Sequence, residues 1–448
     1  MRNRRIKTVF LVVGLLLTIT LSNGQNFDKA KMDSLFSRIE NFEKGMGSVS
    51  IFQNGKEVYQ RSYGYADFEN KIKSDSTTLY RIGSISKTFT ATVIMKLIEE
   101  GKISLSSKLS EFYPQIKNSD KITIEHLLQH RSGIFSFTSA ADYMKWNTKK
   151  HTKKQLINRI KDYGVSFEPD QKFEYSNSNY ALLSFIAEDA SGESFEKLLN
   201  RIIIEPCNLK NTSIGAKINP INNEAYSYVK LFGWEKERET DMSVPVGAGF
   251  IISTSSDLNT FFYYLFNKKI VNGESLQQMK TLKDNFGLGL FRVPFYDMIG
   301  YGHNGSIDGF LSAAYYFPEE DVAIALLENG VACPLNDIVV GALSIYFDET
   351  YQLPEFFIPI VLKSEDLDKY LGVYSTSSLP LKITITKSKN TLIAQGTGQP
   401  AFSLECFDEN KFQFEPANAV IEFIPNENKM ILRQHGQVFE MEKEKKKK

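Results

Sequence analysis

The sequence predicts an α+β protein in which a sheet domain carries a helical insertion and a small all-β module follows. Three observations lead to this prediction. Strand-like and helix-like segments occur at both ends of the stretch 25–355, while residues 104–206 between them are mainly helical and loop-rich. From about Tyr370 onward, short strand-like runs follow one another at a spacing near ten residues.

The composition is typical of a globular protein and excludes some classes of partner. Of the 448 residues, 42% are hydrophobic and 24% are charged, and the formal net charge is zero. No basic surface for nucleic acid is therefore expected. Three cysteines lie far apart in apolar settings, which predicts buried thiols rather than a disulfide framework: Cys207, Cys333 and Cys406.

Residues 1–24 have the pattern of a secretory signal peptide. A cluster of Arg and Lys precedes the apolar run 9–21, and Ser22 and Gly24 follow as small residues at a spacing compatible with cleavage. The run is short for a membrane span, and an uncleaved anchor is the alternative. No cysteine follows the run, so a lipoprotein anchor is not expected. We expect an exported chain, periplasmic or extracellular, without stable membrane insertion after cleavage.

The first predicted elements follow from local patterns. Residues 32–42 are helix-like, and the next run predicts a β-hairpin that turns at Asn54-Gly55. Residues 80–101 predict a strand end, a turn and one amphipathic helix, which Gly101 ends. The apolar stripe of this helix consists of Ile85, Phe89, Val93 and Leu97.

The second half alternates between strands and helices before its character changes. Residues 247–254 predict a strand, residues 256–267 a helix, and residues 309–317 and 322–330 a pair of strands. Residues 356–441 predict a small all-β module, either a barrel or a curled meander. Residues 442–448 form a charged tail that we expect to be disordered.

Ser84 and Lys87 stand at the first turn of the predicted helix, one turn apart on the same face. A helix start gathers unpaired N–H groups and the positive end of the dipole, so it disfavours an ammonium group. A lysine buried there is driven toward its neutral form, which can take the proton of the serine hydroxyl. The free N–H groups can stabilise an oxyanion. The alternative is that Lys87 points into solvent and Ser84 is only an N-cap.

The spacing Ser-x-x-Lys alone is weak evidence for a catalytic serine. It also occurs at Ser194 and at Ser227, and about two or three such matches are expected by chance in a chain of this length. Two further motifs strengthen it. Tyr175-Ser176-Asn177, the single Tyr-x-Asn of the chain, enters a predicted helix from a loop. The single His-x-Gly, His303-Asn304-Gly305, comes just before a strand. Taken singly, the tyrosine would be a packed aromatic residue and the histidine a turn residue.

Together and in this order, the three motifs resemble the serine β-lactamase and penicillin-binding-protein superfamily, in particular its class C-like branch. That branch includes D-aminopeptidases, DD-carboxypeptidases, family VIII carboxylesterases and other β-lactamase-related hydrolases. The phrases YRIGSISKTFT, ITIEHLLQHRSGI, FEYSNSNYALL and GAGFIISTSSDL are similar as well. The resemblance covers residues 47–330, most of the mature chain.

The resemblance implies an antiparallel sheet flanked by helices, a helical subdomain, and an active site between them. It implies Ser84 as the acylated nucleophile, Lys87 as its base partner, and Tyr175 as the group that relays the proton to the leaving group. Asn177 would bind a substrate carbonyl, and the N–H groups of Ser84 and Ser306 would hold the oxyanion. Lys87 and Tyr175 would titrate as a coupled pair. No metal or cofactor is implied.

The third motif departs from the pattern of lactamases and carboxypeptidases, which usually carry Lys-Thr-Gly. Here His303 and Asn304 precede Gly305. Because histidine is mostly neutral near pH 7, a fixed anchor for a substrate carboxylate is lost or weakened. His-x-Gly is familiar in esterases and aminopeptidases of this branch, so penicillin hydrolysis ranks below ester or peptide hydrolysis.

Other kinds of site find less support. His126 and His130 are four residues apart and could imitate zinc ligands, but His-Glu-x-x-His is absent and His130 is expected to hydrogen-bond the turn that follows. The glycines near residues 247 and 287 lack the third glycine of a dinucleotide fingerprint. No Gly-x-Ser-x-Gly elbow supports an α/β-hydrolase.

The sequence thus predicts an exported serine hydrolase that cleaves an ester or an amide/peptide bond of a small substrate through an acyl-enzyme on Ser84. Two alternatives stay open: a DD-peptidase or β-lactamase acting on cell-wall peptides or β-lactams, and a non-catalytic binding protein on the same scaffold. The C-terminal module resembles the lipocalin-like appendage of some relatives. Its candidate roles are to wall the cleft or to serve oligomerisation, and the oligomeric state is open.

Overall fold

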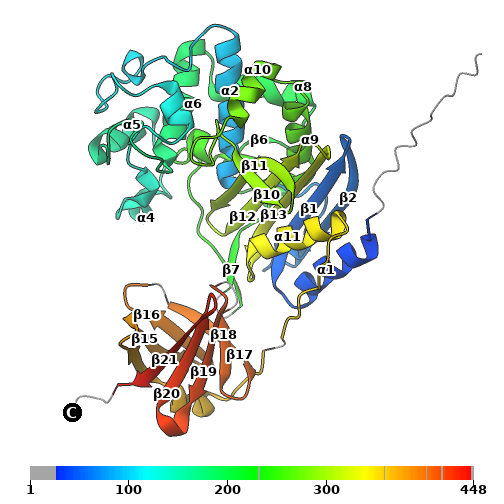
Figure 1. Ribbon diagram of the computed structural model, residues 1–448, viewed down its shortest axis with the longest axis vertical. Helices are drawn as coiled ribbons and strands as arrows, with labels where there is room; N and C mark the ends of the chain where they lie inside the picture. Colours follow the sequence, from blue (N-terminus) through cyan, green and yellow to red (C-terminus); the bar gives the residue numbers. More distant parts are fainter. Residues whose placement is uncertain (1–26, 231–232, 358, 400, 415–416, 445–448) are drawn as a thin grey trace, which may run out of the picture.

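The computed structural model describes residues 27–230, 233–357, 359–399, 401–414 and 417–444. A sheet domain with a helical subdomain forms one part of the molecule, and a barrel forms the other (Figure 1). The expected signal peptide lies outside the described residues. Within the described part of the chain, no helix is long and apolar enough to cross a membrane.

The central sheet has six antiparallel strands in the order β10-β11-β12-β13-β1-β2, so the implied antiparallel sheet is confirmed. The predicted turn at Asn54-Gly55 joins the first two strands in the chain, and both residues have the positive φ that such a turn requires. The strands are β1 (Gly45–Gln53), β2 (Lys56–Tyr63), β10 (Phe291–Phe295), β11 (Met298–Ile307), β12 (Phe310–Phe317) and β13 (Val322–Val331).

Helices cover both faces of this sheet. Along β13, Val322, Ile324 and Leu326 pack into the core that contains α1 (Lys29–Asn41) and α11 (Leu335–Tyr346). The alternate residues of β13 pack on the other face, against α2 (Ser86–Glu99) and α9 (Ser255–Phe266). A strand buried on both faces is continuously apolar, which explains the run Val-Ala-Ile-Ala-Leu-Leu.

The helical subdomain lies beyond α2, as the sequence predicted (Figure 1). Its helices are α3 (Ile124–Leu128), α4 (Tyr143–Trp146), α5 (Lys153–Tyr163), α6 (Asn177–Ser191) and α7 (Phe195–Leu199). Two further helices flank the sheet domain, α8 (Glu205–Cys207) and α10 (Gly273–Lys280). Short strands complete this part: β3 (Tyr65–Asp67), β4 (Ile72–Lys73), β5 (Tyr80–Arg81), β6 (Ser213–Ile214), β7 (Tyr228–Lys230), β8 (Trp234–Lys236) and β9 (Ile251–Ser253).

The C-terminal module is a closed antiparallel barrel, which confirms the predicted all-β module and decides for a barrel over an open meander. Its last strand runs to Lys443, so Glu442 and Lys443 pair with the first barrel strand, although we expected them in the disordered tail. The strands are β14 (Gly372–Thr376), β15 (Leu379–Ser388), β16 (Thr391–Gly396), β17 (Ala401–Asp408), β18 (Lys411–Phe414), β19 (Ala419–Ile424), β20 (Lys429–Gln434) and β21 (Gln437–Lys443).

An ion pair joins the barrel to the sheet domain. Lys44, which precedes β1, donates to the Glu405 carboxylate of β17 at 3.1 Å. The lysine side chain is only 2% exposed, whereas Glu405 is 28% exposed. The lysine end of this ion pair is thus largely removed from water.

A buried titratable group lies inside the sheet. Glu328 on β13 is fully buried, and the Tyr63 hydroxyl of β2 donates a hydrogen bond to its carboxylate. Burial raises the pKa of Glu328 to about 8, although the hydrogen bonds from Tyr63 and the Met46 N–H act in the opposite direction. The carboxyl group is therefore protonated in the native protein at neutral pH.

This carboxyl group should make the protein less stable as the pH rises. Between about pH 4.5, the ordinary value, and about pH 8, the native state holds one proton more than the unfolded state. The free energy of unfolding should fall across this window by roughly 4 kcal/mol, and Glu328→Gln should remove that slope. Urea unfolding at pH 5 and pH 8 measures it, with the exposed Glu125→Gln as control. Equal slopes in wild type and Glu328→Gln would contradict the assignment.

Candidate active site

Three segments that are far apart in the sequence meet at one pocket of about 380 Å³. Ser84 lies in the 3-10 turn Gly83–Ile85 just before α2, Asn177 is the first residue of α6, and Ser306 lies near the end of β11. All three line the pocket, and Lys87 lies behind Ser84 in the first turn of α2. The structure thus brings the three sequence motifs together.

Two glycines let the nucleophile turn approach the sheet. Gly83 has a φ of +51°, and a Cβ there would lie 2.8 Å from the Ser306 nitrogen. A Cβ on Gly305 would lie 2.1 Å from the Ile82 carbonyl oxygen and 3.0 Å from the Ser84 nitrogen. Only glycine fits at either position. The two segments that carry Ser84 and Ser306 consequently lie against each other, and both serines line the pocket.

The Lys87 amine has three oxygen neighbours. Its Nζ lies 2.8 Å from Ser84 Oγ, 2.7 Å from Asn177 Oδ1 and 2.8 Å from the Ala248 carbonyl oxygen. The amide of Asn177 is oriented by its own Nδ2, which donates to Thr138 Oγ1 at 2.8 Å. The oxygen of this amide therefore faces the lysine.

These partners fix where the lysine holds its protons. A neutral amine has two N–H donors and one lone pair. The Asn177 oxygen and the Ala248 carbonyl can only accept, so they take the two N–H bonds. The lone pair is then left for Ser84, whose hydroxyl can donate. This is the arrangement in which a lysine can take the serine proton.

Burial favours the neutral amine. Lys87 is fully buried, and this burial lowers the pKa of its ammonium group well below the usual value. No described carboxylate forms an ion pair with it. The ring of Tyr175 lies 4.9 Å from the amine nitrogen, and that of Tyr180 lies 5.8 Å away.

Tyr175 is neutral as well. Over the whole residue it is 36% exposed, but burial of the hydroxyl end raises the pKa of Tyr175 well above its usual value. Its hydrogen bond with Ser84 acts in the opposite direction and is the weaker effect. Ser84 thus has a neutral amine on one side and a neutral phenol on the other.

His130 supports Tyr175 from behind, a role that its sequence context did not indicate. Its ring lies 4.3 Å from that of Tyr175, and its Nδ1 accepts the Ser176 N–H at 3.1 Å. We expected a bond to the turn after His130, and the partner is instead 46 residues further along the chain. Burial is the largest cause that lowers the pKa of His130 well below its usual value.

The third motif carries a neutral histidine. His303 is 1% exposed, and burial, the largest cause, lowers its pKa to about 3. Its Nδ1 contacts the Asn304 carbonyl, and Nε2 has no hydrogen-bond partner among the described residues. Asn304 itself is exposed. A cationic anchor for a substrate carboxylate is therefore missing at this position.

The competing motifs have structural partners. The Nδ1 of His126 accepts the Thr123 N–H at the start of α3, and it lies on a different network from His130. Ser194 is the N-cap of α7, and Ser227 accepts the Gly309 N–H. Among the described residues, no group of three or more His, Cys, Asp or Glu side chains could hold a metal ion.

Comparison with known proteins agrees with this geometry. Residues 39–335 match the family model described as Beta-lactamase. The teichoic acid D-alanine hydrolase of Staphylococcus aureus (strain NCTC 8325 / PS 47) is 28% identical over 316 residues, which cover 68% of this chain and 74% of that protein.

Solved structures show the same fold. The D-amino acid amidase of Ochrobactrum anthropi SV3, complexed with L-phenylalanine amide, superposes with a TM-score of 0.62 and 25% identity, and covers 71% of this chain and 99% of its own. The octameric penicillin-binding protein homologue of Pyrococcus abyssi has a TM-score of 0.65 and 25% identity, over 93% of this chain and all of its own. The chain therefore belongs to the β-lactamase family, and it is a serine hydrolase.

Proposed function

We propose that this protein is an exported hydrolase that cleaves an ester or amide bond of a small substrate through an acyl-enzyme on Ser84. The observation that carries the proposal is the hydrogen-bond geometry of Lys87, which leaves the lone pair of a buried amine for the serine hydroxyl. No cofactor takes part in the proposed reaction.

The proposed reaction has two halves. In the first, Ser84 Oγ attacks the carbonyl carbon while its proton moves to Lys87. The oxyanion lies between the N–H groups of Ser84 and Ser306. The proton then passes through the Tyr175 hydroxyl to the leaving alcohol or amine, and the acyl group stays on Ser84. In the second half, a water molecule replaces the leaving group and the acid is released.

D-aminoacyl esters and amides are the first substrates to test. The support is that two similar proteins are a teichoic acid D-alanine hydrolase and a D-amino acid amidase. The neutral His303 ranks β-lactams and carboxylate-ended cell-wall peptides second. A panel of D-alanyl and p-nitrophenyl esters, D-amino acid amides and a chromogenic cephalosporin separates these classes. Fastest turnover of the cephalosporin would reverse the order.

Export is the remaining part of the proposal, and it rests on the sequence pattern of residues 1–24. N-terminal sequencing of protein recovered from the cells should give a chain that begins near residue 25. An intact N-terminus on cytoplasmic protein would contradict export, and an intact N-terminus in the membrane fraction would indicate the anchor.

Replacing the nucleophile should abolish covalent chemistry. Ser84→Ala should not react with a fluorophosphonate probe, because the residue that forms the covalent bond is gone. The matched control is Ser194→Ala, which changes the serine of another Ser-x-x-Lys motif and removes only an N-cap. It should label normally and lose about 1 kcal/mol of stability. Failure of the wild-type protein to label would favour the non-catalytic alternative.

The Lys87 amine should set the acid limb of activity. As the pH falls through its lowered pKa, the amine gains a proton, the lone pair is lost, and kcat/KM should decline. Lys87→Ala should slow acylation by roughly 10²–10⁴-fold and remove this limb. The control is Lys96→Ala on the same helix, where the lysine pairs with Glu99. If Lys87→Ala lowered kcat/KM by the same factor at every pH and kept the acid limb, the assignment would be contradicted.

A further inference from the structure

The lumen of the C-terminal barrel is filled at one end and open at the other. Near the 3-10 helix Ser364–Tyr370, the inward side chains are fully packed, including Ile385, Leu392, Phe412 and Met430 at 1% exposure or less. At the opposite end, inward side chains of the barrel and residues of the hydrolase domain together line a cavity of about 820 Å³. This volume is in the range of small-molecule sites.

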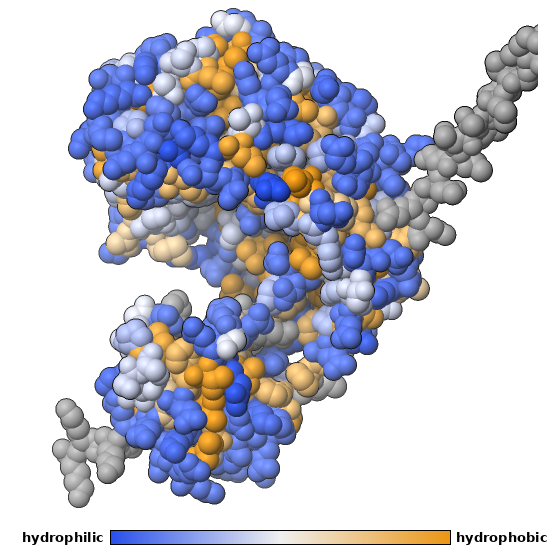
Figure 2. Space-filling view, viewed as in Figure 1, coloured by the Kyte–Doolittle hydropathy of each residue, from blue (hydrophilic) through white to orange (hydrophobic). Residues whose placement is uncertain are grey.

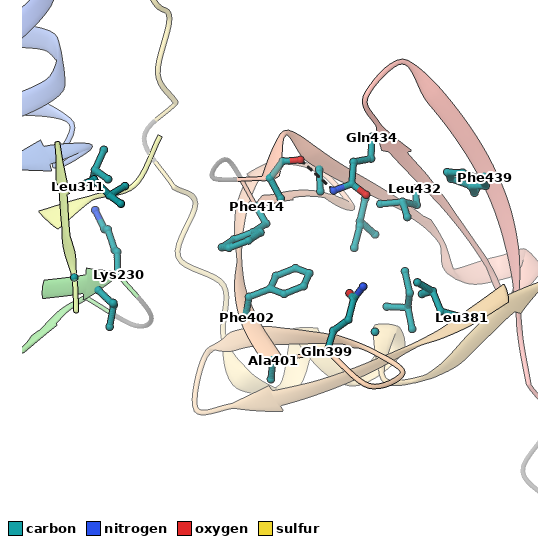
Figure 3. Close-up of a pocket in the computed structure, with 18 of the residues that line it drawn as sticks. Lys230, Leu311, Leu381, Gln399, Ala401, Phe402, Phe414, Leu432, Gln434 and Phe439 are labelled. Atoms are coloured by element: carbon teal, nitrogen blue, oxygen red, sulfur yellow. Dashed lines mark hydrogen bonds between the residues drawn. The ribbon is translucent and has the colours of Figure 1, made fainter. Parts of the chain in front are cut away.

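The barrel part of the cavity is lined mainly by apolar side chains (Figure 3). Phe402 and Phe414 stack at 4.3 Å on one wall, and Leu381 and Leu432 lie across the lumen from them. None of the described barrel residues that line it is charged. The amide of Gln434 is already used, because its Nε2 donates to the Ala417 carbonyl at 3.1 Å. Eight-stranded barrels leave room for side chains or for one slender ligand.

The open end faces the hydrolase domain. Lys230 of β7, Asp308 and Leu311 border the cavity from that side. Asp308 also lines the Ser84 pocket and comes two residues after Ser306. The turn that contains Asp308 therefore borders both the Ser84 pocket and the barrel cavity. Figure 2 shows a notch in the molecular surface between the helical subdomain and the barrel.

We propose that the barrel lumen binds the unbranched aliphatic chain of an amphiphile, whose polar head lies at the mouth beside Lys230 and Asp308. The uncharged barrel lining disfavours an ionic group in the lumen, and the packed floor together with the limited interior of an eight-stranded barrel favours a single chain. Among the described residues that line the cavity, the charged ones, Lys230 and Asp308, belong to the hydrolase domain. Each buried methylene group of the ligand would add affinity.

The aliphatic chain in the lumen can come from two sources. It can be the acyl part of a substrate of Ser84, which rests on the proposed function, or a separate fatty acid held beside the site. Both share the same chemistry in the lumen. The binding test therefore uses the full mature chain carrying Ser84→Ala, which does not turn over ester, so that failure of the proposed hydrolysis leaves the binding result intact.

Binding is measured with cis-parinaric acid, a fatty acid that fluoresces when its chain enters an apolar site. Saturation at one probe per chain is expected. Residues of β19 alternate between the lumen and the outer face, so Ala419→Trp fills the cavity and Val420→Trp adds the same group outside. Ala419→Trp should weaken binding about tenfold or more, and Val420→Trp should leave it unchanged. Leu381→Gln repeats the test at a half-buried position if Ala419→Trp unfolds.

Absence of saturable binding, or equal affinity in the lumen and outer-face variants, would overturn the proposal. With binding established, p-nitrophenyl esters from acetate to laurate identify the source in the active protein. A rise of kcat/KM with chain length that Ala419→Trp removes would assign the lumen to the substrate. A flat series in the presence of bound probe would assign it to a separate fatty acid. Either result supports the aliphatic-chain site.

Discussion

The active site depends on keeping the Lys87 amine out of water. An exposed amine would be protonated at neutral pH and would have no lone pair for Ser84. Burial removes the charge, and the two acceptors, Asn177 and the Ala248 carbonyl, direct the remaining lone pair. Each acceptor comes from a different segment, so the protonation state of one side chain requires that the subdomain, α2 and the strand region near Ala248 are assembled together.

The same requirement explains the close approach of the nucleophile turn to the sheet. Gly83 and Gly305 let the segments that carry Ser84 and Ser306 lie against each other. Nearby, the Arg81 guanidinium, which is 2% exposed, donates to Asp308 at 2.9 Å and to the Thr240 carbonyl at 3.0 Å. This buried charge pair ties the strand before Ser84 to the turn after Ser306. Such a pair is costly to break from one side, so it holds the two segments in register.

The sequence predicted those elements whose structure depends on neighbouring residues. The hairpin at Asn54-Gly55, the helix with Ser84 and Lys87 and the barrel strands follow from turn chemistry and periodicity. The order of the three motifs predicted which residues meet. The Ala248 carbonyl could not be predicted, because every residue has one. The role of His130 was missed because its partner, Ser176, is distant in the chain, and a bond to the turn directly after His130 was expected instead.

The barrel is closed at its floor, where Leu367 and Tyr370 are 1% and 2% exposed. A ligand in a lumen that is closed at one end must leave by the route through which it entered, past β7 and the turn at Asp308. Its residence time would then depend on how far the two domains separate, and not on the affinity of the lumen alone. The Lys44–Glu405 contact, by resisting that separation, would slow both entry and escape.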